Sequence, residues 1–125
     1  MIYKTINTML RNVVLLVRKF WHMILGEYPV VTHDFYLHIL KNNADIVAYL
    51  QDDGYVKLAA GWLIEKCGWK GYRKGDAGVH EQQSLVLVNY GGANGLEISQ
   101  LADEICSSVK KEFGVELDTE VNIIN

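Results

Sequence analysis

The stretch of sequence that decides the fold spans residues 84–114 and reads SLVLVNYGGANGLEISQLADEICSSVKKEFG. It begins with a continuous apolar run, residues 85–88, which is typical of a buried β-strand. A glycine-rich turn follows, and beyond it apolar residues recur every three or four positions up to Phe113, which predicts an amphipathic helix. Asn94 is placed to cap that helix, with Glu97 three residues later as in a capping box, and Gly114 is placed to end it.

Shorter elements are predicted on both sides of this strand–turn–helix unit. Before it, Thr32 can cap a short helix, and a second helix is predicted over about residues 57–67, ended by Gly68 in a left-handed conformation. After it, apolar residues alternate over residues 115–123, which is typical of a half-buried strand. We therefore expect an α+β fold with a small, mainly antiparallel sheet packed with about three helices, plus an extra N-terminal helix.

Residues 1–26 differ from the rest of the chain in charge. They carry four basic and no acidic side chains, whereas residues 27–125 carry eight basic and fifteen acidic ones. Their apolar residues have helical spacing, which favours a helix that packs on the domain or a stretch that is not native to it. A basic amphipathic helix on a membrane surface and a signal peptide are the other interpretations. We divide the chain into this basic amphipathic segment, 1–26, and a domain, 27–125.

Length, charge and cysteine usage exclude several classes of function. A chain of 125 residues is too short to hold a flavin or dinucleotide domain together with a full substrate domain. Its net charge of −3 disfavours a nucleic-acid-binding protein, so we expect no nucleic-acid partner. Cys67 and Cys106 lie far apart without Cys-x-x-Cys spacing, which favours a reduced, cytoplasmic protein. No apolar run reaches the length of a membrane span.

The turn at residues 91–95 and the histidines are the first places to search for a binding site. Backbone N–H groups between a strand and a helix N-terminus can hold a phosphate. The sequence Gly91-Gly92-Ala93-Asn94-Gly95 lacks the dinucleotide-binding spacing, however, which favours a tight connection followed by a cap. His33 and His38 do not have the spacing that places two metal ligands on one helical face, so no metal site is predicted.

Glu120 is a carboxylate on the predicted closing strand, which is otherwise rich in Val and Ile. Burial on such a strand would raise its pKa, as a general acid requires. Its acidic neighbours Glu116 and Asp118 favour the alternative, a solvent-facing charge on an edge strand.

Several motifs, in order along the chain, carry a resemblance to a known family. They are VKLAAGWLIEKC (56–67), KGYR (70–73), GDAGVH (75–80) followed by Gln82 and Gln83, LVN (87–89) and FGVELDTEV (113–121). In this order they resemble the C-terminal, substrate-binding domain of UDP-N-acetylenolpyruvoylglucosamine reductase, also called UDP-N-acetylmuramate dehydrogenase. The resemblance runs from about Pro29 to Ile124.

The resemblance implies a cytoplasmic flavoenzyme of bacterial peptidoglycan synthesis. In that family NADPH reduces FAD, the flavin passes a hydride to the enolpyruvyl group of a UDP-sugar, and an acid protonates the adjacent carbon to give UDP-N-acetylmuramate. The flavin lies in two domains upstream of the part that this chain resembles. The expected small-molecule partner is therefore UDP-N-acetylglucosamine enolpyruvate, and we expect this chain by itself to bind neither FAD nor NADPH.

The resemblance also assigns roles to individual residues. Glu120 matches the glutamate of the closing strand that takes part in protonation, which favours the general-acid interpretation. Tyr49 resembles the loop tyrosine that closes over the nucleotide in one subclass, and Gln83 matches a glutamine that contacts the substrate. Lys57 and Lys70 match family lysines suited to a pyrophosphate, with solvated surface lysines as the alternative for both.

Two positions depart from the family's pattern. When the sequences are aligned on Pro29, the family's catalytic serine falls on Ile24 and the asparagine before the proline falls on Tyr28. An isoleucine can neither donate nor relay a proton. The family's flavin-binding segment and catalytic arginine would lie upstream of this chain. We therefore expect a truncated member that is inactive alone, with a separate flavin domain as a candidate partner. The alternative is a non-catalytic UDP-sugar-binding or protein-interaction module.

Overall fold

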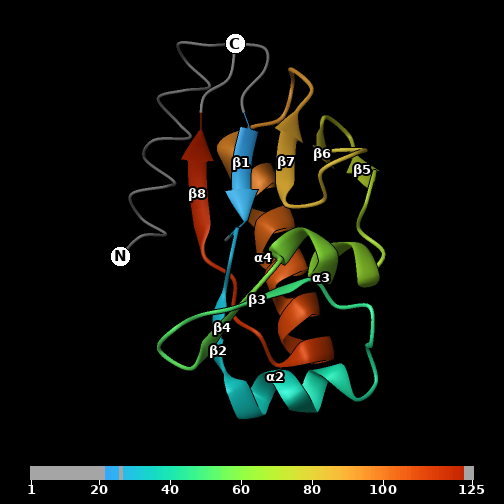
Figure 1. The fold of residues 1–125 in the computed structure, drawn as a ribbon. Helices are drawn as coiled ribbons and strands as arrows, with labels where there is room; N and C mark the ends of the chain where they lie inside the picture. The colour runs from blue at the N-terminus through green and yellow to red at the C-terminus, as the bar shows by residue number, and fades with distance from the viewer. Residues whose placement is uncertain (1–21, 26, 123–125) are drawn as a thin grey trace.

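The structure, a computed structural model, describes residues 22–25 and 27–122, with side chains for Leu25 and residues 27–118 (Figure 1). Its elements form two antiparallel sheets and three helices, which confirms the predicted α+β class. In chain order they are β1 (His22–Leu25), β2 (Val30–Thr32), α2 (His33–Leu40), β3 (Ala48–Leu50), β4 (Tyr55–Leu58), α3 (Ala60–Lys66), β5 (Arg73–Lys74), β6 (Ala77–Val79), β7 (Val86–Asn89), α4 (Gly95–Phe113) and β8 (Thr119–Asn122).

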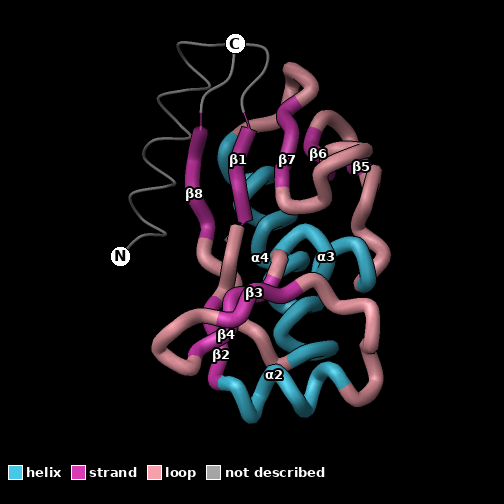
Figure 2. Tube along the Cα trace, in the orientation of Figure 1, coloured by secondary structure: helices cyan, strands magenta, loops and turns pink. Residues whose placement is uncertain are grey.

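The larger sheet has five strands in the order β5-β6-β7-β1-β8 (Figure 2). β1 therefore lies between β7 and β8 and pairs with both in antiparallel register. All four residues of β7 are buried, as its continuous apolar run predicts. Because β7 precedes α4 and β8 follows it, the chain passes through α4 from one side of β1 to the other.

The smaller sheet has three strands in the order β2-β4-β3 and lies beyond the tip of β1, next to α2 (Figure 1). Burial alternates along β4: Val56 and Leu58 are buried, whereas Tyr55 and Lys57 are exposed. The alternation means that one face of this sheet packs on the core and the other faces solvent.

Helix α4 packs on the larger sheet and supports the core. Its apolar stripe, including Ile98 and Ile105, is fully buried and contacts β6, β7 and α3. The predicted capping box is confirmed, because the Glu97 N–H donates to Asn94 Oδ1 at 2.8 Å and Glu97 Oε1 accepts from the Asn94 N–H. Gly114 ends the helix at φ +71°, and a Cβ there would also lie 3.2 Å from the Phe35 ring.

The two shorter helices follow the predicted signals with one correction. Thr32 caps α2 by accepting a hydrogen bond from the Phe35 N–H at 3.2 Å, and Gly68 takes the predicted left-handed conformation just after α3. The prediction that α3 begins near Lys57 is wrong, because residues 55–58 form β4 and the helix begins at Ala60. Pairing on both sides, with β2 and with β3, holds this segment as a strand.

The predicted N-terminal helix is wrong at its C-terminal end. The expected helix includes residues 22–25, but they form β1, because β7 and β8 supply backbone partners on both sides. The remainder of the expected helix, and with it the suggested membrane contact, falls on residues 1–21, which lie outside the described residues. The division of the chain at residue 26 stays a prediction. Within the described part, no helix has the length and apolar character needed to cross a bilayer.

Candidate functional site

The candidate site lies where the two sheets meet. β1 ends at Leu25, whose N–H donates to Leu85 O at 2.8 Å, and the chain then passes through residues 27–29 into β2. Two backbone hydrogen bonds fix that connection to the segment leading into α3, from Leu58 N–H to Pro29 O and from Ala60 N–H to Glu27 O. The junction therefore couples the ends of β1 and β7 to the small sheet.

Glu120 lies on β8 at this end of the larger sheet. Its register partner on β1 is Ile24, and the partner of Ile24 on β7 is Val86. Position 24 is where the resemblance places the family's catalytic serine, so the register makes that position and Glu120 direct cross-strand neighbours. Sequence spacing could not have shown this, because the two positions are far apart in the chain.

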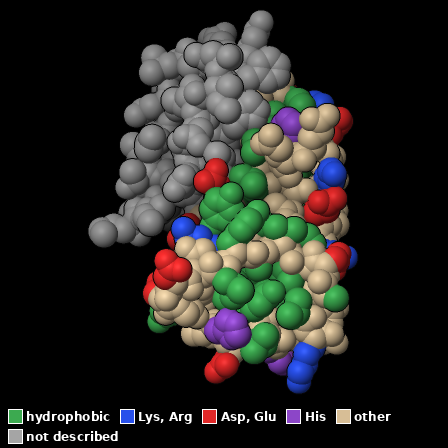
Figure 3. Space-filling view, viewed as in Figure 1, with side chains coloured by type: hydrophobic (Ala, Val, Ile, Leu, Met, Phe, Trp, Pro, Cys, Tyr) green, Lys and Arg blue, Asp and Glu red, His purple; other side chains and the backbone are tan. Residues whose placement is uncertain are grey.

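Tyr49 and Lys57 are brought together on the small sheet. They are register partners on β3 and β4, and on its other side Lys57 is the register partner of Val30 on β2. The Tyr28 ring meets the Tyr49 ring edge-on at 5.7 Å between centroids. We call these four residues, Tyr28, Val30, Tyr49 and Lys57, the tyrosine–lysine face. All four are exposed, and Figure 3 shows hydrophobic side chains gathered over this part of the molecule.

Lys57 forms no ion pair with any side chain that the structure describes. Within the part of the chain whose side chains are described, the ion pairs involve Lys66, Lys70, Arg73 and Lys110, and none involves Lys57. An exposed ammonium with aromatic neighbours can meet an anion that carries an apolar or ring-shaped group.

Gln83 lies in the loop that joins β6 to β7. Its carbonyl accepts from the Val86 N–H at 2.9 Å, and Val86 is the register partner of Ile24. The loop is therefore at the same end of the larger sheet as Glu120. The Gln83 side chain is exposed and has no hydrogen bond within the described part of the chain.

Lys70 does not join this group. It lies in the connection from α3 to β5, which is the edge strand opposite β8, and its Nζ is 3.3 Å from Glu65 Oε1. Both side chains of this pair are about half exposed, so the pair is a solvated surface ion pair. Its proposed contact with a pyrophosphate stays a prediction.

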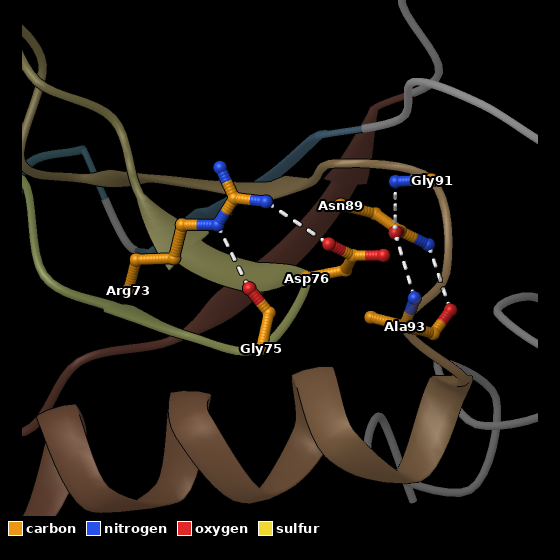
Figure 4. Close-up of polar contacts among 6 residues, drawn as sticks. All are labelled: Arg73, Gly75, Asp76, Asn89, Gly91 and Ala93. Atoms are coloured by element: carbon orange, nitrogen blue, oxygen red, sulfur yellow. Dashed lines mark hydrogen bonds and ion pairs between the residues drawn. The ribbon is translucent and has the colours of Figure 1, made fainter.

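The glycine-rich turn after β7 is filled by the protein's own side chains (Figure 4). Buried Asn89 accepts from the N–H groups of Gly91 at 2.8 Å and Ala93 at 3.1 Å, and its amide donates to Ala93 O at 2.9 Å. The Asp76 carboxylate lies against Gly92, where a Cβ would strike it. The structural interpretation of this turn is the better one, since the N–H groups of Gly91 and Ala93 are engaged and the space beside Gly92 is occupied.

Arg73, on β5, contacts the residues around the same turn. Its Nη2 is 2.9 Å from Asp76 Oδ1, its Nε donates to Gly75 O at 2.8 Å, and its guanidinium lies 3.9 Å from the centroid of the Tyr90 ring. The hairpin of β5 and β6 is thereby fixed to the turn after β7. Asn89 was missed as a structural residue, although a polar residue that ends an apolar run before Gly-Gly is a usable signal.

A surface groove lies apart from the predicted residues. It has a volume of about 450 Å³ and is lined by Asp45, Trp62, Glu65 and Lys66. The Lys66 ammonium lines it, 3.2 Å from Asp45 Oδ2 and 5.3 Å from the centroid of the Trp62 ring. This neighbour holds the pKa of the Asp45 carboxyl below its usual value. Within the described residues, no group of His, Cys, Asp and Glu side chains is arranged to hold a metal ion.

Comparison with known proteins identifies the family. The sequence model of one protein family, the C-terminal domain of UDP-N-acetylenolpyruvoylglucosamine reductase, matches residues 38–124. The chain belongs to this reductase family. Glu120, Tyr49, Gln83, Lys57 and Lys70 all fall within the matched range.

Individual relatives agree with the family model. The chain is similar to the UDP-N-acetylenolpyruvoylglucosamine reductases of Pseudomonas syringae (56% identical over 95 residues, 76% of this chain and 28% of that protein), Pseudomonas aeruginosa (58% over 79 residues, 63% and 23%) and Porphyromonas gingivalis (49% over 96 residues, 77% and 28%). The match thus covers about a quarter of each reductase, and it is the C-terminal domain that this chain shares with the family.

Proposed function

We propose that this chain supplies the substrate-binding part of the reductase and holds a UDP-sugar on the tyrosine–lysine face. The observation that carries the proposal is the position of Lys57, in register between Val30 and Tyr49 and without an ion pair in the described part of the chain. A diphosphate carries negative charge that an ammonium can meet as a point charge. The neighbouring tyrosine rings offer flat apolar surfaces to a sugar or base.

Gln83 and Glu120 are proposed to have separate roles, one in recognising the sugar and the other in protonation. The amide of Gln83 can donate and accept hydrogen bonds, which suits recognition of a sugar's polar groups. Glu120 is proposed as the acid that protonates the carbon next to the one that receives the hydride. Support for this comes from the chain itself, since the Gln83 loop and Glu120 flank the same end of β1.

FAD would supply that hydride in the family, but the glycine-rich turn does not fit it. The N–H groups of Gly91 and Ala93 are engaged by Asn89, and Asp76 occupies the space beside Gly92. We propose that FAD and NADPH bind to the part of the reductase that this chain does not match, supplied as a separate flavin domain where one is present. The residues of this chain are then left with two tasks, binding the sugar and holding the proton.

A second candidate function is favoured by the register of β1 and β8. Glu120 is opposite Ile24, the position that the resemblance assigns to a serine, and a hydrocarbon side chain cannot donate or relay a proton. A chain that keeps the tyrosine–lysine face without that hydroxyl would bind the UDP-sugar and leave it unreduced. The two candidates differ in turnover and agree in binding.

A titration with a turnover assay tests both. The isotope-labelled 125-residue chain is titrated with UDP-N-acetylglucosamine enolpyruvate, and we expect amide shifts at Tyr49, Lys57, Gln83 and Glu120. Absence of shifts at these positions contradicts the binding proposal. The chain is expected to be colourless and not to oxidise NADPH, so a yellow preparation with UDP-sugar-dependent turnover contradicts the proposed place of the flavin.

A further inference from the structure

The loop that carries Gln83 is organised around one side chain, His80. The His80 Nδ1 accepts hydrogen bonds from two successive backbone N–H groups, those of Gln82 at 3.0 Å and of Gln83 at 3.2 Å. A ring nitrogen that accepts must be unprotonated, so the neutral ring carries its proton on Nε2. The imidazole is half-buried, whereas residues 81–83 are exposed, so it lies under the tip of the loop.

The base of the loop is closed without the imidazole. The His80 N–H donates to Val86 O at 2.8 Å, and the Val86 N–H donates to Gln83 O at 2.9 Å. The first bond links the end of β6 to β7 and the second ties the Gln83 carbonyl to β7, whatever side chain stands at position 80. The ring therefore acts on the N–H side of the loop tip, where it engages the N–H groups of Gln82 and Gln83.

We propose that His80 is a positioning residue for substrate binding: its Nδ1 holds the backbone of Gln83 so that the exposed amide of Gln83 is presented in one orientation. The inference rests on the proposed function, in which Gln83 contacts the UDP-sugar. A glutamine side chain on a loosened loop would lose conformational freedom on binding, and this loss would weaken the affinity. By holding the loop, His80 reduces that loss.

The test replaces the acceptor and then restores it. His80→Phe keeps an aromatic ring without an acceptor, whereas the side-chain oxygen of His80→Asn can accept the N–H two or three residues further on, as in an Asx turn or a helix cap. In the full chain we expect His80→Phe to speed amide hydrogen exchange of Gln82 and Gln83 about tenfold and to weaken binding of UDP-N-acetylglucosamine enolpyruvate about fivefold. We expect His80→Asn to restore both to within about twofold of the wild type.

Two further measurements separate positioning from a general structural role. The ¹⁵N shift of His80 Nδ1 in the wild type should show an unprotonated acceptor, and the urea midpoint of His80→Phe should stay close to that of the wild type. A Gln83→Ala variant should bind as weakly as His80→Phe, and the double variant should bind no more weakly than either.

The outcomes distinguish the two proposals. Full binding by His80→Phe together with weak binding by Gln83→Ala overturns the role of His80 and leaves the proposed function standing. Unchanged exchange of Gln82 and Gln83 in His80→Phe also overturns it. If the wild-type chain binds no UDP-sugar, the proposed function fails, and the role of His80 in substrate binding fails with it.

Discussion

The glycine-rich turn after β7 and the tyrosine–lysine face of the small sheet are opposites in how their polar groups are used. In the turn, Asn89 engages the backbone, Asp76 fills the space beside Gly92, and Arg73 binds Asp76. On the face, the Lys57 ammonium has no ion pair in the described part of the chain and the rings beside it are exposed.

The difference teaches where a ligand can bind. A buried polar group that already has its hydrogen bonds gains nothing from a ligand and loses stability when a partner is removed. An exposed group without a partner contributes little to stability and remains available for binding. Changes in the turn should therefore act on folding, and changes on the face should act on affinity.

The largest effect is expected from Asn89→Ala. The substitution leaves the N–H groups of Gly91 and Ala93 and the Ala93 carbonyl without their side-chain partner. We expect the free energy of unfolding to fall by about 3 kcal/mol, measured by urea denaturation. Asn43→Ala, which removes one part-buried hydrogen bond to Ile39 O, is the matched control and should cost about 1 kcal/mol or less. Equal losses of unfolding free energy in the two variants would contradict the larger contribution to stability expected of Asn89.

Next in size is the effect of Lys57→Ala on affinity. We expect the Kd for the UDP-sugar to rise about tenfold, which corresponds to about 1.4 kcal/mol, because in the proposed complex the ammonium meets the diphosphate. The urea midpoint should not change measurably, since Lys57 is exposed and unpaired among the described side chains. Lys70→Ala is the control, and because Lys70 pairs with Glu65 we expect less than a twofold change in Kd. A larger loss of affinity in Lys70→Ala than in Lys57→Ala would contradict the assignment of Lys57 as the residue that binds the diphosphate.

A smaller cost is expected from Gly92→Ala. The new Cβ would strike the Asp76 carboxylate, which must then swing away from Arg73. Because that ion pair is about half exposed, we expect a loss of about 1 kcal/mol in the free energy of unfolding. In an Asp76→Ala background the same substitution should cost much less, and an unchanged cost there would show that the carboxylate is not the obstacle.

The smallest expected effect has the opposite sign. The Ser84 hydroxyl is buried and has no hydrogen-bond partner in the described part of the chain. Ser84→Ala should therefore leave stability unchanged or raise it by up to about 1 kcal/mol in thermal unfolding. Ser99, equally buried on α4, does have an interaction partner, so Ser99→Ala should lower stability. A loss of stability in Ser84→Ala would indicate a partner for the Ser84 hydroxyl.

Local signals were sufficient for the elements that depend on neighbours in the sequence. The capping box of α4, the Thr32 cap of α2 and the left-handed Gly68 and Gly114 were all predicted, because each depends on residues within a turn or two. Around Lys57 the sequence predicts a helix, but the segment forms a strand because β2 and β3 pair with it on either side. β1 was missed for the same reason.

The candidate site shows the same limit. The resemblance supplied Tyr49, Lys57, Gln83 and Glu120 as separate residues, but only the register shows that Tyr49 and Lys57 are cross-strand partners. The pairing of Glu120 with Ile24 likewise depends on a strand order that places β1 beside β8. His80 stood inside one of the family motifs, and the geometry of its Nδ1 was needed to give it a role.

The place of β1 in the larger sheet bears on how this domain should be expressed. The family match begins at residue 38, after β1 and β2 and inside α2. A fragment cut to that match would leave β7 and β8 with bare backbone edges and β4 with one open side. Unprotected strand edges recruit strands from other molecules, so such a fragment should aggregate. The cloning boundary should be set by the hydrogen-bonded ladder, which requires that the fragment begin before His22.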